Sequence, residues 1–320
     1  MTLRLGLLST ADINEKLVAG ARRAESVEVV AIGSRDPSRA RTQAGELGVP
    51  RALGSYEEVL EDPGVDAVYI ALPNSLHVEW SVRALEAGKH VLCEKPMSRH
   101  PEEVERAFDA ADAAGRVLAE AFMWRHHPQA RRLRELAPEV GDVRLVRATF
   151  SFPLPPEENV RWNASLDGGA LMDVGCYCVS GARFLLGEPT QVTAQGVGGD
   201  VDARVVGTMA FASGALAHFD CGFDLSFRDE LEVVGERGAL FLDDPWHSRK
   251  AAIDVRAADG TEETVEVEEA DPYGCELEDF ARACAGEVLE HPFGRADALG
   301  QARVIAALYE AADSGRAVAL

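Results

Sequence analysis

The stretch Leu3-Arg4-Leu5-Gly6-Leu7-Leu8-Ser9-Thr10-Ala11-Asp12-Ile13-Asn14 decides the fold of the first part of the chain. Its first six residues form a short apolar run typical of a buried strand, and the polar turn after them leads into a helical pattern. The expected strands of this part are Leu3–Leu8, Val27–Ile32, Ala67–Leu72, Val91–Cys93 and Val117–Ala119. The expected helices are Ala11–Ala24, Pro37–Leu47, Tyr56–Leu60, Leu76–Ala87 and Pro101–Ala114. Repeated strand–helix units with right-handed crossovers predict a doubly wound parallel sheet of the α/β class.

The pattern changes after about Trp124, where strands separated by glycine-containing turns replace the strand–helix units. The expected strands are Val143–Phe152, Gln191–Val197, Arg204–Phe211, Ala215–Gly222, Glu230–Gly235, Ala239–Leu242, Ile253–Ala257 and Glu263–Glu268. The expected helices are Pro128–Leu136, Gly169–Leu186, Glu276–Ala285 and Ala296–Ala312. This part predicts an α+β domain with an open, mostly antiparallel sheet. We therefore expect domains at 1–124 and 125–320, and the C-terminal helix could pack back on the first domain.

The amino-acid composition limits which partners the protein can bind and in which cell compartment it is expected. With 320 residues and 47% hydrophobic content, the chain can form two domains with proper cores. A formal net charge of -22 argues against nucleic acid and against an anionic membrane surface. No run approaches the roughly 20 apolar residues of a membrane span, and the N-terminus lacks the pattern of a signal peptide. A cytoplasmic protein without membrane partners is expected.

The cysteines do not indicate a metal site. Cys176 and Cys178 form the closest pair, and no second pair or histidine pair completes a zinc site. We expect reduced thiols and no structural metal. An anionic cofactor in so acidic a chain must then be held by local positive groups.

The turn Ser9–Asn14 lies where a dinucleotide-binding domain carries G-x-G-x-x-G, and Ser9, Ala11 and Asn14 hold the three glycine positions. Small residues still let the backbone approach a pyrophosphate, and the free amides of a helix N-terminus suit an anion. The same residues also fit an ordinary turn in which Ser9 or Thr10 caps the helix.

The end of the second strand favours one nicotinamide cofactor. NAD enzymes place an acidic residue there to bind the ribose 2′-hydroxyl. Here Ser34 and Arg35 occupy the place, with Arg39 one turn later. A hydroxyl and a guanidinium suit a 2′-phosphate, whereas Asp36 fits a helix cap better. The sequence therefore predicts NADP over NAD.

Two further motifs follow strand ends. Glu94-Lys95-Pro96 comes directly after the strand Val91–Cys93, at the edge where open α/β sheets bind ligands. A lysine there can be desolvated and take part in proton chemistry, although a lone Lys-Pro is more often a surface turn. Leu72-Pro73-Asn74 with His77 follows the preceding strand. Asn74 could cap a helix and His77 could merely pack, or both could border the nicotinamide.

Three motifs in order along nearly the whole chain resemble one family. They are Leu72-Pro73-Asn74 with His77, Ala87–Pro96 ending in Glu-Lys-Pro, and Gly168-Gly169-Ala170-Leu171-Met172-Asp173-Val174-Gly175-Cys176-Tyr177. They resemble the glucose–fructose oxidoreductase, inositol 2-dehydrogenase and rhizopine-catabolism family (Gfo/Idh/MocA). The resemblance implies a Rossmann domain, a second domain for substrate and for oligomerisation through its open sheet, and a homodimer or homotetramer.

The resemblance also assigns roles to residues. It places Lys95 beside the nicotinamide, with a Lys95–Pro96 bond that is often cis. Asp173 and the residue four later share a helical face, and the inositol dehydrogenases have histidine where this chain has Tyr177. That difference, with Ala121–Pro128, resembles the branch of NADP-dependent D-xylose 1-dehydrogenases and dimeric dihydrodiol dehydrogenases. Trp124, Arg125 and His126 are expected to wall the substrate pocket. The expected cofactor-binding residues are Ser9, Thr10, Ala11, Ile13, Ser34, Arg35, Arg39, Leu72, Pro73, Asn74, His77, Glu94, Lys95 and Trp162.

These roles imply an NADP-dependent oxidoreductase that moves hydride between the nicotinamide and a carbinol or carbonyl carbon of a sugar or polyol. Lys95, Tyr177 and Asp173 are the expected catalytic residues. A tyrosine with a pKa of about 10 is a poor base at neutral pH, and a neighbouring Lys95 would lower it. Lys95 could equally carry the proton itself. An aldose 1-dehydrogenase or a dihydrodiol dehydrogenase is favoured, and a ketosugar reductase or a non-catalytic NADP-binding regulator are the alternatives.

Overall fold

The computed structural model describes residues 2–155, 159–289 and 294–320, and the chain forms two compact units. The first unit comprises Met1–His126 and Ala270–Leu299, and the second comprises His127–Glu269 and Gly300–Leu320. The segment from Ala270 to Leu299, which the sequence placed in the second domain, belongs to the first unit.

The first unit is built on a parallel sheet of six strands with the order β3-β2-β1-β4-β5-β6. The strands are β1 (Leu3–Leu8), β2 (Val27–Gly33), β3 (Arg51–Leu53), β4 (Ala67–Ile70), β5 (His90–Glu94) and β6 (Leu118–Ala121). The helices are α1 (Ile13–Ala21), α2 (Pro37–Leu47), α3 (Tyr56–Glu61), α4 (His77–Glu86), α5 (Pro101–Ala114) and α8 (Pro272–Cys284). This confirms the predicted doubly wound sheet. Strand order reverses between β1 and β4, so ligands are expected at the carboxyl ends of these strands.

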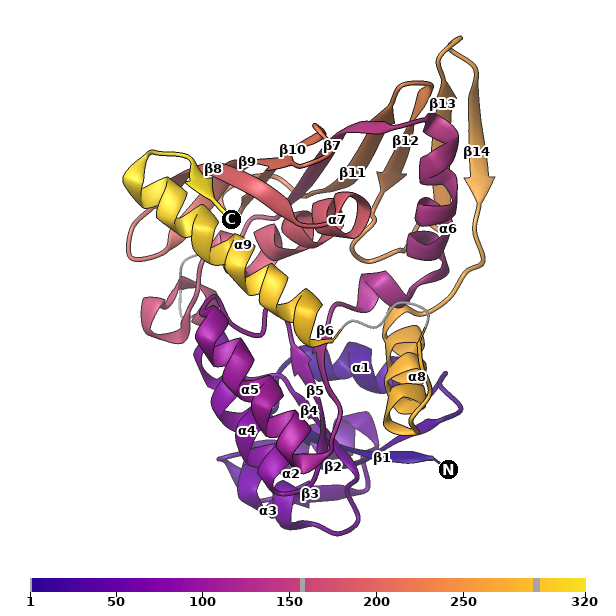
Figure 1. The fold of residues 1–320 in the computed structure, drawn as a ribbon. Coiled ribbons are helices and arrows are strands. Elements are labelled where there is room, and N and C mark those ends of the chain that lie inside the picture. Colours follow the sequence, from indigo (N-terminus) through magenta and orange to yellow (C-terminus); the bar gives the residue numbers. More distant parts are fainter. Residues whose placement is uncertain (1, 156–158, 290–293) are drawn as a thin grey trace. The chain divides into compact units, whose positions relative to one another are not determined.

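Helices cover both faces of this sheet. Figure 1 shows α4 and α5 packed together on one side and α1 and α8 packed together on the other. Gly20 permits the second contact, because a β-carbon there would lie 2.7 Å from the Gly274 nitrogen. The sequence gives no local sign of this pairing, since α8 follows α1 by some 250 residues along the chain.

The second unit is built on a sheet of nine strands with the order β14-β13-β12-β11-β7-β10-β9-β8-β15. Its strands are β7 (Val143–Ser151), β8 (Pro189–Gly198), β9 (Asp202–Phe211), β10 (Leu216–Gly222), β11 (Arg228–Gly235), β12 (Gly238–Asp243), β13 (Ala252–Ala257), β14 (Glu262–Glu266) and β15 (Val318–Ala319). All pairs are antiparallel except β10 with β7. The sheet is therefore mostly antiparallel, as predicted.

The helices α6 (Pro128–Leu136) and α7 (Cys176–Leu186) belong to the second unit, and α9 (Arg295–Ser314) enters it at Gly300. The predicted helix Gly169–Leu186 is not uniform, because a π-helical turn, Leu171–Gly175, precedes α7. The helical stretch Ala164–Leu186 is long and apolar enough to cross a membrane, but 78% of its most apolar window is buried, as in a core helix.

Candidate functional site

The turn after β1 has a glycine-like conformation at a non-glycine residue. Ser9 is buried and has a φ of 145°, a region that side chains rarely adopt. Its hydroxyl accepts a hydrogen bond from the Ala11 N–H at 3.2 Å. The helix α1 begins after Asp12 and has no side-chain cap, so neither Ser9 nor Thr10 caps it. Ile13, its first residue, is half-buried.

Asn14 ties this turn to the neighbouring helix. It is fully buried, and its Nδ2 donates to the Ser9 carbonyl at 3.0 Å and to Gln43 Oε1 at 2.9 Å. Gln43 Nε2 donates in turn to the Ala11 carbonyl at 3.2 Å. The Asn14 Oδ1 atom is buried without a hydrogen-bond partner among the described residues, which leaves an acceptor at the position of the third fingerprint glycine.

Two exposed guanidinium groups follow β2, that of Arg35 in the turn after the strand and that of Arg39 in the first turn of α2. Asp36 caps α2 by accepting from the Ser38 N–H at 2.8 Å and the Arg39 N–H at 3.4 Å, which confirms its predicted capping role. The hydrogen bonds from Ser38 lower the pKa of Asp36. Ser34 is buried, and its hydroxyl accepts from the Asp36 N–H at 3.2 Å. Arg35 and Arg39 are exposed and form no ion pair with any residue that the structure describes.

The ends of β4 and β5 are joined through one buried histidine. The two ring nitrogens of His77 lie 2.8 Å from the Leu72 carbonyl and 3.0 Å from the Pro96 carbonyl. The bond between Lys95 and Pro96 is cis, as the family resemblance implied. Lys95 is half-buried, and the preceding Glu94 accepts a hydrogen bond from Tyr69.

The residues near these strand ends keep their own local roles. Pro73 precedes a short 3-10 turn that begins at Asn74, and α4 starts at His77 with Leu76 as its N-cap residue. Burial raises the pKa of Tyr69 well above its usual value, and the adjacent Glu94 adds to the rise. A neutral tyrosine is thereby kept as a donor to Glu94 beside Lys95.

These features fit a dinucleotide cofactor. The small side chains of Ser9 and Ala11 leave the backbone of the turn open to close approach, and Ser9 adopts a positive φ that favours glycine. Arg35 and Arg39 place two exposed positive charges just after β2 and in the first turn of α2, where the Asp36 carboxylate is engaged in capping the helix. Ser9, Ala11, Ser34, Arg35 and Arg39 would therefore hold the cofactor's phosphate and ribose groups. When bound, the nicotinamide would supply a hydride acceptor or donor.

The predicted pocket residues Trp124, Arg125 and His126 form a buried 3-10 turn, Met123–His126, that packs against α8. Arg125 forms an ion pair with Asp297, and its guanidinium lies 4.4 Å from the Phe122 ring centre. His126 Nδ1 lies 2.8 Å from Asp279 Oδ2. The two acidic partners were not foreseen, because both lie more than 150 residues further along the chain.

Steric constraints in the second unit explain the second glycine of the Gly-Gly pair that precedes Asp173. Gly169 has a φ of 121°, and a β-carbon there would lie 2.2 Å from Asp202 Oδ1. The Asp202 carboxylate accepts from the Leu171 N–H at 2.6 Å and from the Tyr309 hydroxyl at 2.9 Å. It therefore holds the amino end of the helical run that carries Asp173 and Tyr177. The sequence analysis missed Asp202 and Tyr309, since only long-range contacts reveal them.

Asp173 lies in the π-helical turn and Tyr177 in the first turn of α7. A π-helical turn is rare and occurs often at functional sites. Asp173 Oδ2 accepts from Arg161 Nε at 2.7 Å, an ion pair not foreseen from the sequence. A β-carbon at Gly175 would lie 2.8 Å from Cys221 Sγ, so the run lies tightly against β10. Asp173 and Tyr177 thus belong to one rigid helical run.

Aromatic rings surround Tyr177, which is only 6% exposed. The Phe150 ring lies edge-on at 5.4 Å between centres, and the Trp246 ring lies at 6.0 Å. The predicted cofactor residue Trp162 is half-buried in the short 3-10 turn Val160–Trp162. It contacts Phe223 at 5.3 Å and donates to the Pro155 carbonyl at 3.1 Å.

Comparison with known proteins agrees with this geometry. Residues 8–122 match the model of an oxidoreductase family with an NAD-binding Rossmann fold, and residues 129–241 match the GFO/IDH/MocA C-terminal domain. The chain is 42% identical to D-xylose 1-dehydrogenase (NADP(+)) 2 of Haloferax volcanii, over 99% of this chain and 100% of that one.

Two further similarities extend the picture. Trans-1,2-dihydrobenzene-1,2-diol dehydrogenase of Danio rerio is 34% identical over 75% of this chain and 74% of its own. The crystal structure of a 3-ketoreductase from Actinomadura kijaniata in complex with NADP and TDP-benzene superposes with a TM-score of 0.90 at 31% identity, covering 97% of this chain and 98% of that one. This chain therefore belongs to the Gfo/Idh/MocA family of oxidoreductases, as its motifs implied.

Proposed function

We propose that this protein is an NADP-dependent dehydrogenase that oxidises an aldose of the D-xylose type at a carbinol carbon. The observation that carries the proposal is the full-length similarity to an NADP-dependent D-xylose 1-dehydrogenase, at 42% identity. Lys95, Asp173 and Tyr177 are all present in this chain, which favours an enzyme over a non-catalytic regulator.

The preference for NADP is supported by charge. A 2′-phosphate carries negative charge that a ribose hydroxyl lacks, and charge-assisted hydrogen bonds are stronger than neutral ones. Arg35 and Arg39 are exposed at the end of β2, and the nearby carboxylate of Asp36 is engaged in capping α2. An acidic residue that would repel the phosphate and bind the 2′-hydroxyl is not at this position.

In the proposed reaction the protein removes the proton of the substrate hydroxyl. Tyr177 is the preferred base, and Lys95 either lowers the pKa of the tyrosine or takes the proton itself. Asp173 would hold a second substrate hydroxyl as an acceptor. Its ion pair with Arg161 would fix the direction of that carboxylate. Trp124, Arg125 and His126 would line the sugar, and the ion pairs with Asp297 and Asp279 would hold two of them in place.

A ketosugar reductase is the second candidate. The solved 3-ketoreductase superposes over nearly the whole chain, so the fold accommodates that reaction as well. The two functions differ in substrate and direction and share the proposed acid–base residues.

The protein is further proposed to work in the cytoplasm as a homodimer or homotetramer. The exposed face of the second sheet includes Val206 on β9 and Leu216 on β10, which are more than half exposed. Apolar side chains on an open sheet face are suited to cover by a second copy of the chain.

The test is turnover with NADP and NAD against a panel of aldoses, polyols, dihydrodiols and ketosugars, followed by nicotinamide absorbance. We expect oxidation of a pentose or related aldose with NADP. Turnover only in the reductive direction with a ketosugar would favour the second candidate. No turnover with any member of the panel would contradict both.

A further inference from the structure

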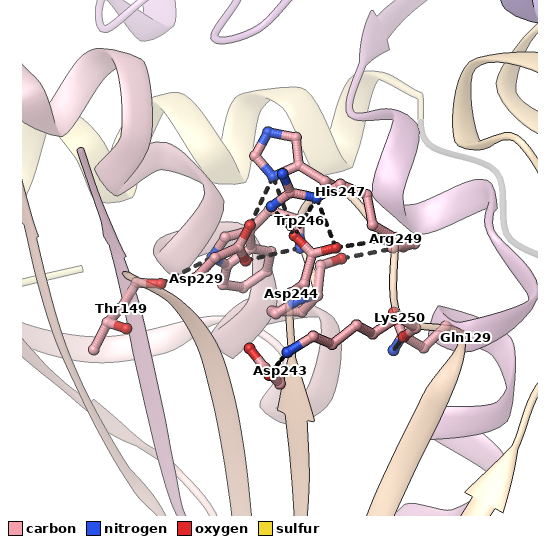
Figure 2. A network of polar contacts seen from close by, with 11 residues as sticks. Gln129, Thr149, Asp229, Asp243, Asp244, Trp246, His247, Arg249 and Lys250 are labelled. Carbon is pink, nitrogen blue, oxygen red and sulfur yellow. Dashed lines mark hydrogen bonds and ion pairs between the residues drawn. The ribbon is translucent and has the colours of Figure 1, made fainter. Parts of the chain in front are cut away.

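A buried polar cluster in the second unit lies beside the aromatic rings that contact Tyr177. Figure 2 shows its contacts running from Asp229 through His247 to Asp244 and Arg249. Asp229 belongs to β11, and the other three residues belong to the segment between β12 and β13. The side chain of Asp229 is 1% exposed and that of Asp244 is 5% exposed. Burying two carboxylates is costly unless they are paired and hydrogen-bonded, so the cluster needs the imidazole of His247 and the guanidinium of Arg249.

Asp229 holds two consecutive residues of that segment. Its Oδ1 accepts from the Trp246 N–H at 3.2 Å, and its Oδ2 lies 2.6 Å from His247 Nδ1. The main chain is fixed as well, because the Asp244 N–H donates to the Asp229 carbonyl at 2.7 Å. The Trp246 indole N–H donates to the Thr149 carbonyl at 3.0 Å. Trp246 is therefore held by one hydrogen bond from its backbone N–H and another from its ring N–H.

The same two residues reach the rings around Tyr177. The Trp246 ring contacts the Tyr177 ring at 6.0 Å between centres. His247 contacts Phe150 edge-on at 5.5 Å, and Phe150 contacts Tyr177 at 5.4 Å. Gly181 makes room for the indole on α7, since a β-carbon there would lie 2.7 Å from Trp246 Cη2. Aromatic pairs in such geometries attract each other beyond the effect of the area that they bury.

The cluster is better described as an ion-pair network than as a metal site. One ligand atom from each of Asp229, Asp244 and His247 lies within 4.8 Å of the others, as metal ligands could. However, Arg249 donates to Asp244 from its N–H at 2.6 Å and from Nε at 3.0 Å. A guanidinium thus already neutralises one carboxylate, and the imidazole N–H faces the other.

From this geometry we propose that Asp229 and His247 are positioning residues for Tyr177. Their hydrogen bond holds Trp246 and Phe150 against the tyrosine ring and so fixes the direction of its hydroxyl. The catalytic consequence rests on the proposed function, in which Tyr177 moves the substrate proton. The structural consequence, a fixed Tyr177 ring, does not depend on it.

The test compares His247→Ala with His247→Asn, whose amide nitrogen takes the place of Nδ1 and can still donate to Asp229. Asp243→Asn is the matched control. It removes a carboxylate next to Asp244 that is 64% exposed and forms an ion pair with the exposed Lys250. The readouts are the ring resonance of Tyr177 in protein labelled with ¹³C-tyrosine, assigned with Tyr177→Phe, and kcat against KM for NADP.

We expect His247→Ala to shift the Tyr177 resonance and to lower kcat by about tenfold or more, with KM for NADP unchanged, because a misplacement of about 1 Å can lower the rate by about 10². His247→Asn should restore most of the wild-type Tyr177 resonance position and most of kcat. Asp243→Asn should match the wild type in both measurements. An unshifted Tyr177 resonance in folded His247→Ala would overturn the proposal. So would an unchanged kcat in His247→Ala where Tyr177→Phe is impaired. If Tyr177→Phe itself keeps full turnover, the assigned role of Tyr177 fails, and the resonance alone then decides the positioning.

Discussion

At the scale of single residues, the chain holds its candidate groups by contacts that the sequence does not reveal. The sequence predicted Lys95 as a candidate from its place at a strand end. The contacts of the His77 ring nitrogens with the Leu72 and Pro96 carbonyls became visible only in the structure. Asp173 was foreseen from its motif, and its partner Arg161 was not. Local patterns identify a residue that follows a strand or opens a helix, whereas partners distant in sequence become visible only in the structure.

Arg35 and Arg39 should decide between the two nicotinamide cofactors. Arg35→Ala and Arg39→Ala should each raise KM for NADP by about tenfold or more, because a charge-assisted hydrogen bond is lost. KM for NAD should change little. Arg41→Ala is the control, since Arg41 is exposed on the same helix and lies outside the proposed site. Steady-state kinetics with both cofactors measure this, and equal effects on NADP and NAD would contradict the assignment.

Lys95 and Tyr177 should govern the rate constant and leave cofactor binding intact. Lys95→Ala and Tyr177→Phe should each lower kcat by about 10² or more, the scale of lost acid–base catalysis. The Kd of NADP, measured by titration calorimetry, should stay near that of the wild type. Turnover close to wild type in either variant refutes the role assigned to that residue.

At the scale of elements, the helical run that carries Asp173 and Tyr177 is defined by contacts at its amino end and along its side. The sequence predicted a helix over Gly169–Leu186, but the π-helical turn Leu171–Gly175 was not predictable from its pattern. Nor was β3 (Arg51–Leu53), because three half-buried edge residues lack an apolar run. Long apolar or amphipathic segments were predicted well, and short elements stabilised by their neighbours were not.

Gly169 should be intolerant of a side chain. Gly169→Ala combines a φ of 121° with a β-carbon 2.2 Å from Asp202 Oδ1, so it should destabilise the protein by about 1–3 kcal/mol. Gly45→Ala is the matched control within α2, where a β-carbon would meet nothing within 4 Å and should stabilise by about 1 kcal/mol. Thermal unfolding measures both. Equal melting temperatures for the two variants would contradict this account of the Gly-Gly pair.

Asp202 should give the second unit a pH-dependent stability. Burial raises the pKa of Asp202 above its usual value of 3.8. A carboxyl with a raised pKa binds its proton more tightly in the folded state. Its contribution to the free energy of unfolding is therefore largest below the pKa of the unfolded state and is lost as pH rises through the pKa of the folded state. The melting temperature of the wild type relative to Asp202→Asn should therefore fall as pH rises from about 4. Parallel melting curves across pH would contradict the shift.

At the scale of the whole molecule, the fold class could be read from the sequence, because a change from strand–helix units to successive strands marks the second unit. The membership of Ala270–Leu299 in the first unit could not, since α8 packs against α1 across the length of the chain. The net charge also acts at the scale of the whole molecule. A chain with a net charge of -22 can bind an anionic cofactor only where local positive charges outweigh the surrounding negative ones, as we propose for Arg35 and Arg39.

The open face of the second sheet should carry the contact between subunits. Leu216 and Val206, which are 54% and 55% exposed, lie on this face, so Leu216→Arg should weaken assembly by placing a charge in an apolar contact. Sedimentation velocity should show a dimer or tetramer for the wild type and a lighter species for the variant. Val288→Arg is the control, because Val288 is 93% exposed and belongs to the first unit. A monomeric wild type would contradict the proposal.

The central claim is hydride transfer between NADP and the anomeric carbon of an aldose. Its most direct test is incubation of the wild-type protein with NADP and an aldose deuterated at C1, with mass spectrometry of the reduced cofactor. The account predicts one deuterium in the NADPH and none from solvent, and labelled NADPH formed about 10² or more times slower with Tyr177→Phe under the same conditions. Unlabelled NADPH, or no reduced cofactor from any deuterated aldose of the panel, would contradict it.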